Sequence, residues 1–125
     1  MSNPPVLVWC EIPVTDMEKA CDFYAKVFGY KMEIDTSGPN PMAFLNGLSD
    51  ATAGHLYPGS PSQIGSGNTV HLAILNGDSV EKAAKRAEEN GGTVGGPIIE
   101  MDFGRWQYGT DPDGNSIGLF ETKGA

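Results

Sequence analysis

The stretch "EIPVTDMEKACDFYAKVFGY", residues 11–30, contains the signals of a strand, a turn and a helix in one run. Its first residues end an apolar run, 6–12, that predicts a strand. Thr15 and Glu18 have the spacing of a capping box, which predicts the start of the helix. One apolar stripe then recurs at three- and four-residue steps: Met17, Ala20, Cys21, Tyr24, Val27 and Phe28. Gly29 predicts the helix end, because glycine accepts the left-handed conformation.

Three short strands are predicted after this helix. They are "KMEID" from Lys31, "PMAFL" from Pro41 and "ATAGHLY" from Ala51, with turn-rich segments between them. The segment that follows, 58–68, has no periodicity and is rich in Gly, Pro and Ser, so we expect a linker or a mobile loop there.

The same order of elements then repeats. "TVHLAIL" from Thr69 predicts a strand, and Asp78 with Glu81 forms a second capping-box pattern before a helix that "NGG" at 90–92 closes. Three further strands are predicted: "TVGGPII" from Thr93, "GRWQYGT" from Gly104 and "SIGLFE" from Ser116. The turn "DPDGN" joins the last two, and we expect its acidic residues, Asp111 and Asp113, to face solvent as turn formers.

A constant offset relates the two halves. The helix starts Asp16 and Asp78, the helix stops Gly29 and Gly91, and the strand residues Trp9 and His71 are each separated by the same distance along the chain (78 − 16, 91 − 29 and 71 − 9 all equal 62). The chain is therefore predicted to be α+β, with two tandem βαβββ modules. The modules are 6–57 and 69–122, within one domain, 1–125. A ferredoxin-like fold is the alternative, but the additional strands predicted from Ala51 and Ser116 argue against it.

Composition excludes several partners. Acidic residues outnumber basic ones by 16 to 8, and the net charge of −8 disfavours nucleic acid and anionic membrane surfaces while favouring cationic small molecules. No apolar run approaches the roughly 20 residues that cross a bilayer, and "MSNPPVLVWCEI" lacks an export signal, which predicts a cytoplasmic protein. Cys10 and Cys21 lack a CxxC spacing, so we expect reduced core thiols rather than a disulfide, a zinc site or a nucleophile.

Together, the paired modules, "EIPVTDMEKACDFYAKVFGY", "NGG" and "DPDGNSIGL" resemble the vicinal oxygen chelate superfamily of glyoxalases, bleomycin-resistance proteins and extradiol dioxygenases. The resemblance spans nearly the whole chain and is greatest to a bacterial group described only as glyoxalase-like. It implies a single domain of this superfamily, whose curved sheets form an open barrel-like cavity with the helices outside. It also implies a homodimer with its cavities at or near the interface.

In metal-dependent members, four ligands, mostly His and Glu, come from the first and fourth strands of each module. The resemblance places four residues there: Trp9, His71, Gly118 and either Gly54 or His55. Because tryptophan and glycine side chains cannot coordinate a metal, we expect no metal cofactor. An improvised set of His71, His55 and Glu11 is the alternative, and it would suit nickel, zinc, manganese or iron.

Side-chain alternation predicts the lining of the cavity. Trp9, Glu11 and His71 should lie at one end, with Gly118 beside His71. The strand from Gly104 contributes either Trp106 and Tyr108 or Arg105 and Gln107, according to its register. Aromatic rings and one carboxylate suit an aromatic or cationic ligand, although core or dimer packing would also explain the rings.

Two functions follow from this resemblance. The first is a metal-free protein that binds a small organic molecule, as bleomycin-binding relatives do. The second is a metal-dependent enzyme, either a lactoylglutathione lyase-like isomerase (or another lyase or isomerase of the superfamily) or a dioxygenase. In the isomerase, Glu11 would be the catalytic residue that moves the proton.

Overall fold

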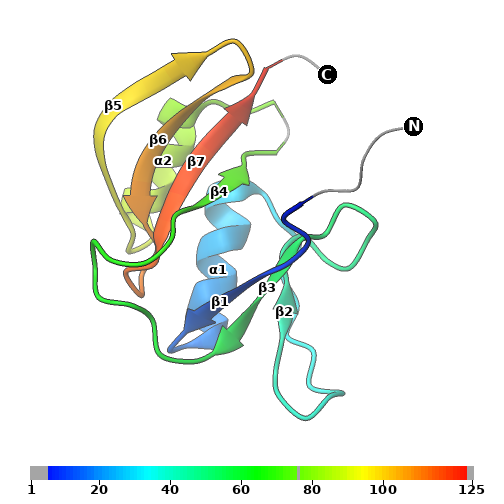
Figure 1. Ribbon diagram of the computed structural model, residues 1–125. Coiled ribbons are helices and arrows are strands. Elements are labelled where there is room, and N and C mark those ends of the chain that lie inside the picture. The colour runs from blue at the N-terminus through cyan, green and yellow to red at the C-terminus, as the bar shows by residue number, and fades with distance from the viewer. Residues whose placement is uncertain (1–5, 76, 124–125) are drawn as a thin grey trace.

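The computed structural model describes residues 6–75 and 77–123, which form two sheets and two helices (Figure 1). The ends of the expected 1–125 domain and the start of the "MSNPPVLVWCEI" segment lie outside the described residues. In chain order the elements are β1 Cys10–Val14, α1 Met17–Phe28, β2 Ala43–Phe44, β3 Gly54–Pro58, β4 Val70–Ala73, α2 Val80–Glu89, β5 Thr93–Met101, β6 Gly104–Thr110 and β7 Ser116–Thr122. No described helix is long and apolar enough to span a bilayer.

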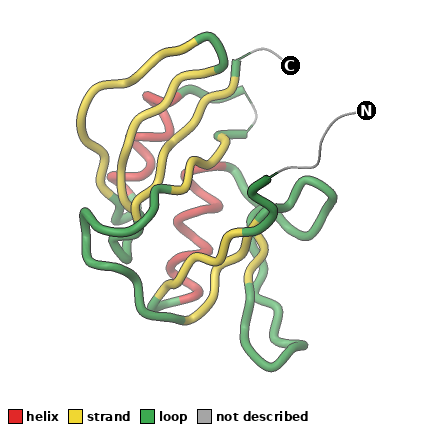
Figure 2. The backbone as a smooth tube through the Cα atoms, viewed as in Figure 1, coloured by secondary structure: helices red, strands yellow, loops and turns green. Residues whose placement is uncertain are grey.

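The two sheets share one topology. Their strand orders are β1-β3-β2 and β4-β7-β6-β5, and in each sheet the first strand of the unit pairs in parallel with the last. This pairing confirms the predicted α+β fold of two tandem βαβββ units. Figure 2 shows the long loop between β3 and β4 that connects them, and Figure 1 shows both helices behind the strands in that view.

The first unit is less regular than expected. "KMEID" is not a strand, because only Asp35 bridges to Met42, and "PMAFL" is reduced to the two residues of β2. Towards the other end of the segment, Lys31 N donates to Asn46 Oδ1 at 3.0 Å. The segment is therefore tethered near both ends, and between them no strand pairing forms. The first strand also begins later than predicted, at Cys10 rather than Val6.

Both helices begin one residue later than the capping boxes predicted. Asp16 caps α1 by accepting a hydrogen bond from Lys19 N, and Ser79 caps α2 by accepting one from Lys82 N. Thr15 instead donates to Asp113 through both its backbone N–H and its hydroxyl. Gly29 ends α1 at φ 82°, as the sequence predicted.

One apolar core lies between the helices and the sheets. Alternate strand residues point into it, among them Val14 and Leu56 from the first sheet and Ile117 and Leu119 from the second, all fully buried. Because alternate residues of a strand face opposite ways, the intervening residues lie on the faces that the helices do not cover. The candidate site residues are on these outer faces.

Asp111 is buried, at 2 % exposure, and does not face solvent as expected. Its Oδ2 accepts hydrogen bonds from the Tyr24 hydroxyl at 2.7 Å and Asn115 Nδ2 at 2.9 Å, and its Oδ1 accepts from the backbone N–H of Asp113 and Asn115. Asn115 Nδ2 also donates to the Pro13 carbonyl. This carboxylate therefore joins the β6–β7 turn of the second unit to α1 of the first.

Candidate functional site

Two groups of aromatic side chains lie on the uncovered sheet faces. The first, named the N-terminal cluster, consists of the rings of Trp9, Phe44 and His55 together with the carboxylate of Glu11. Glu11 lies directly opposite His55 in the parallel β1–β3 pair, and Phe44 lies opposite His55 in the β2–β3 pair. His55, rather than Gly54, therefore shares the face of Glu11. Gly54 lies close to the β1 backbone, where an added Cβ would come within 2.6 Å of the Cys10 carbonyl oxygen.

A hydrogen bond orients His55 within the N-terminal cluster. Trp9 Nε1 donates to His55 Nδ1 at 2.9 Å, and the rings of Trp9 and Phe44 meet edge to face with centroids 6.1 Å apart. Because Nδ1 accepts, a neutral imidazole carries its proton on Nε2. His55 Nε2 lies 3.7 Å from Glu11 Oε2. This distance is too long for a hydrogen bond, but it is short enough for an electrostatic attraction between the two side chains. His55 was a candidate metal ligand, and the lone pair on its Nδ1 already accepts the hydrogen bond from Trp9.

The second group, named the C-terminal cluster, lies on the four-stranded sheet and consists of His71, Phe103, Trp106, Tyr108 and Phe120. The His71 ring meets the rings of Trp106, Tyr108 and Phe120 at steep angles, with centroids 5.5–6.1 Å apart. Gly118 lies opposite both His71 and Tyr108 in the sheet, and a Cβ added to it would overlap His71 Nδ1. The glycine is thus what allows the imidazole to lie flat against the strand.

Three rings of the C-terminal cluster are nearly parallel. Phe103, Trp106 and Phe120 have pairwise interplanar angles of 9–16° and centroid separations of 5.5–6.2 Å. Phe103 lies between β5 and β6 and is 62 % exposed, whereas Trp106 is 9 % exposed. Phe103 and Phe120, like Phe44 in the other cluster, are site candidates that the sequence reasoning missed. The alternation that selected Gly118 also selects Phe120, two residues further along β7.

The register of β6 determines which of its side chains lie on the same sheet face as His71. Trp106 and Tyr108 lie on the His71 face, while Arg105 points to the other side, where its guanidinium contacts Glu81 of α2 at 2.7 Å and Glu121 of β7 at 3.0 Å. Gln107 donates to the Gly96 carbonyl at 2.9 Å. The hydrogen bond with Glu81 is the main reason that the pKa of Arg105 is raised, and this residue is not part of the site.

Trp9 and Glu11 belong to the N-terminal cluster, whereas His71 belongs to the C-terminal cluster. Among the described residues no hydrogen bond, ion pair or ring contact joins the two clusters. Glu11 borders a cavity of about 430 Å³ with His55 and Tyr57. It also borders one of about 180 Å³ that reaches Val70 at the start of β4. Glu11 therefore borders one cavity on its own sheet and another that reaches the start of the second sheet.

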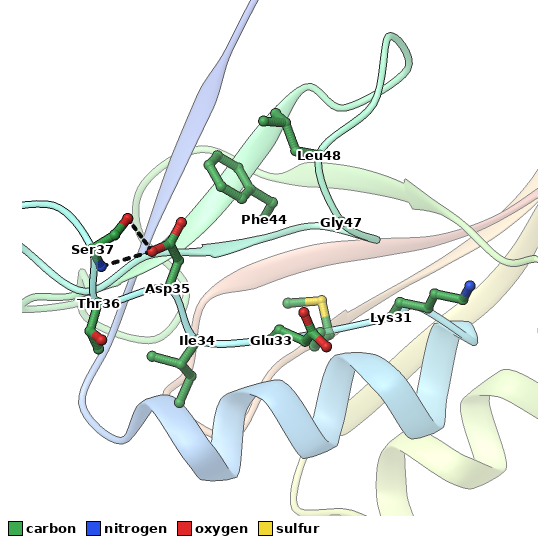
Figure 3. A pocket seen from close by; sticks show the side chains of 10 residues that line it. Lys31, Glu33, Ile34, Asp35, Thr36, Ser37, Phe44, Gly47 and Leu48 are labelled. Carbon is green, nitrogen blue, oxygen red and sulfur yellow. Dashed lines mark hydrogen bonds between the residues drawn. The ribbon is translucent and has the colours of Figure 1, made fainter.

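A larger cavity, of about 900 Å³, lies where the predicted "KMEID" strand is missing (Figure 3). Residues 31–37 form one wall, and Phe44, Gly47 and Leu48 form the other. Asp35 Oδ1 accepts hydrogen bonds from Ser37 N and its hydroxyl, which lower the pKa of that carboxyl. Phe44 connects this cavity to the N-terminal cluster, because its ring also contacts Trp9 and His55.

The residues at the superfamily's metal positions do not fit a metal ion. Trp9 and Gly118 have no donor atom for one, and the His71 ring occupies the space that a ligand side chain at position 118 would need. In the described part of the chain, no three His, Cys, Asp or Glu side chains come close enough to hold an ion, so His71 does not join His55 and Glu11.

The two thiols are free and lie on the core side of their elements. Cys21 is buried on α1, and Cys10 is half-buried against the core. Burial raises the pKa of both thiols, and the nearby carboxylates of Glu11 and Asp22 raise them further. The thiols are thus disfavoured as thiolates and are poor nucleophiles.

Known proteins resemble this chain along most of its length. TnmS3, an antibiotic-binding protein from Streptomyces sp. CB03234, is 26% identical, and the match covers 98% of this chain and 100% of that one with a TM-score of 0.59. A glyoxalase/bleomycin resistance protein from the same organism is 28% identical, with a TM-score of 0.58 over 88% of this chain and 95% of its own.

A curated relative is longer. The candidate glyoxylase CFP32 of Mycobacterium tuberculosis is 29% identical over 118 residues, which is 90% of this chain and 44% of the relative. The chain therefore spans less than half the length of the curated relative that it matches. The model of the Glyoxalase/Bleomycin resistance protein/Dioxygenase superfamily matches residues 6–119. With that match and the paired βαβββ topology, this chain belongs to the glyoxalase/bleomycin resistance protein/dioxygenase superfamily.

Proposed function

We propose that this chain binds a planar organic molecule against the C-terminal cluster, without a resident metal ion. The observation that supports this proposal is the group of aromatic rings on a sheet face that no described helix covers. Ring faces of this kind offer stacking area to a planar ligand. His71, Trp106 and Tyr108 would contact the molecule, and Gly118 would keep His71 in place beneath it.

Charge narrows the class of ligand. The chain has a net charge of −8, and the side chain of Glu11 is 64 % exposed on the neighbouring sheet. We therefore expect a neutral or cationic molecule. The likeness to TnmS3, an antibiotic-binding protein, over 98% of this chain and 100% of that one supports small-molecule binding as the function.

Titration with acridine orange, a planar cationic dye, tests the proposal. We expect Tyr108→Ala to weaken binding about tenfold, the usual loss when one stacking contact is removed. Leu48→Ala is the matched control, because Leu48 is also exposed but borders the cavity of Figure 3. If Leu48→Ala weakens binding and Tyr108→Ala does not, the ligand lies in that cavity and the proposed location is wrong. If the dye does not bind the wild-type chain, the proposed function fails.

The metal-dependent enzyme is the second candidate. It is supported by the proximity of Glu11 and His55 and by the likeness to a candidate glyoxylase, CFP32. Thermal-shift assays with nickel, zinc, manganese and iron, followed by metal analysis after dialysis, separate the two candidates. We expect no stoichiometric metal. One equivalent of metal that is retained by the wild-type chain and lost in both His71→Ala and Glu11→Gln would reverse the order of the two functions.

The remaining expectations rest on the superfamily resemblance. We propose that the chain works as a single domain, that two copies form a homodimer and that the protein is cytoplasmic. Sedimentation velocity tests the dimer directly, because a monomer at all concentrations would exclude it.

A further inference from the structure

Trp106 has an unusual indole group. The residue is 9 % exposed, yet its Nε1 is buried and has no hydrogen-bond partner among the described residues. The chain's other indole differs, since Trp9 Nε1 donates to His55 Nδ1 at 2.9 Å. Buried donors in folded proteins are nearly always paired, because an unpaired one has lost its hydrogen bond to water without replacement. The Trp106 donor therefore calls for an acceptor that the chain does not supply.

The surroundings of Trp106 limit where that acceptor can come from. β6 is an inner strand, in which Trp106 pairs with Ile99 on one side and Phe120 on the other, and no described carbonyl accepts a hydrogen bond from its Nε1. The rings around the indole belong to His71, Phe103 and Phe120, none of which accepts a hydrogen bond from Nε1–H. The acceptor must therefore arrive from the uncovered face.

Phe103 is the ring that can most easily give access. It lies in the short connection between β5 and β6 and is 62 % exposed, while its face is stacked on Trp106 at 5.8 Å. Moving this side chain breaks its ring contacts with Trp106 and Phe120, and none of these three residues belongs to the apolar core cluster. A planar ligand that replaces the Phe103 ring would retain the stacking on the indole.

We propose that the ligand of the C-terminal cluster carries a neutral hydrogen-bond acceptor next to its planar ring, and that this atom accepts a hydrogen bond from Trp106 Nε1–H. The inference rests on the proposed function and specifies its ligand class. An aza nitrogen or a carbonyl oxygen meets the requirement, whereas the net charge of −8 disfavours a carboxylate or phosphate. Trp106 is then the residue that distinguishes heteroaromatic molecules from hydrocarbons of the same shape.

Quinoline and naphthalene form a suitable pair of probes, since they differ by one ring nitrogen in place of C–H. Their affinities are measured by calorimetry for the wild-type chain, Trp106→Phe and Trp9→Phe, at a mildly alkaline pH where quinoline is unprotonated. We expect the quinoline-to-naphthalene affinity ratio to fall about tenfold in Trp106→Phe, as for the loss of one buried hydrogen bond. Trp9→Phe is the matched control and should keep the wild-type ratio.

A second measurement on the unmodified chain covers the case in which Trp106→Phe does not fold. The two indole N–H protons give two NMR signals, and quinoline should shift the Trp106 signal downfield while naphthalene does not. An unchanged affinity ratio in Trp106→Phe, or a Trp106 signal that quinoline leaves in place, overturns the inference. If acridine orange binds but neither probe does, the inference also fails and the proposed function stands. If the dye does not bind either, both fail.

Discussion

Replacing Tyr24 with phenylalanine should destabilise the protein by removing one hydroxyl from a buried carboxylate. Tyr24 is fully buried and donates to Asp111 Oδ2 at 2.7 Å, while its ring stacks on Phe28 at 5.9 Å. Phenylalanine keeps the ring contacts, so the loss is close to that of the hydrogen bond alone. Hydrogen bonds to charged groups contribute about 1.5–3 kcal/mol, and we expect a loss of about 2 kcal/mol in the free energy of unfolding.

Urea denaturation measures this loss. The midpoint should fall while the slope stays unchanged, since the surface exposed on unfolding is the same. Tyr30→Phe is the matched control, because the Tyr30 hydroxyl donates to an uncharged acceptor, the Ala73 carbonyl, also at 2.7 Å. We expect about 1 kcal/mol there. If Tyr24→Phe costs no more than Tyr30→Phe, the Asp111 carboxylate does not join the two units as described.

Three further predictions concern the site, the pH response and the helix starts. Gly118→Ala should displace the His71 ring, lower stability by about 1–3 kcal/mol and abolish dye binding, as followed by urea denaturation and titration; unchanged binding would mean that His71 does not need this glycine. Burial, followed by the charge of Asp111, raises the pKa of Tyr24, and burial raises that of Tyr30, so above about pH 10 the unfolded chain loses protons that the native state keeps. Stability should then fall by up to about 1.4 kcal/mol per pH unit for each tyrosine, and a flat denaturation midpoint across this range contradicts the burial of both groups. Asp16→Ala should cost about 1 kcal/mol in urea denaturation as an N-cap loss, as should Ser79→Ala, and an unchanged stability of Ser79→Ala would refute the second cap.

Every element of the second unit could be predicted from its sequence, although β4 is shorter and β5 longer than expected. β6 spans Gly104–Thr110 as expected, because β-rich residues lie between strong turn signals at both ends. In the first unit, "KMEID" has the alternation of a strand but no strand to pair with along its length. Only Asp35 forms a β-bridge, and its partner is Met42. Whether a short polar segment pairs depends on tertiary contacts that alternation does not contain.

The helix starts show a related limit. Thr15 has the residue type of an N-cap, but its hydroxyl bonds to Asp113, which is 98 positions away in sequence. Local spacing cannot reveal a competitor so distant along the chain. The same holds for Asp111, which is a typical turn residue whose burial depends on the Tyr24 hydroxyl of another element.

Alternation grouped the site residues by face, but it left open the choice between Gly54 and His55 and the register of β6, and it did not place the two sheets. Glu11 and His55 share a face, and so do His71 and Trp106, as the two-residue period requires. Whether Trp9 and His71 line the same end of a cavity depends on how strongly the sheets curve towards each other, which strand patterns do not encode. Phe103 was missed for another reason, because it lies in a turn where no period applies.

The close fit of His71 over Gly118 restricts how this chain could change by mutation. A side chain with a metal-binding atom at position 118 would occupy the space that the His71 imidazole now fills. Position 118 and His71 therefore cannot both supply metal ligands in their present places. A lineage that gained metal binding would have to shift His71 first and then replace the glycine. Because each change alone would be harmful, a metal-binding side chain at position 118 would be difficult to gain.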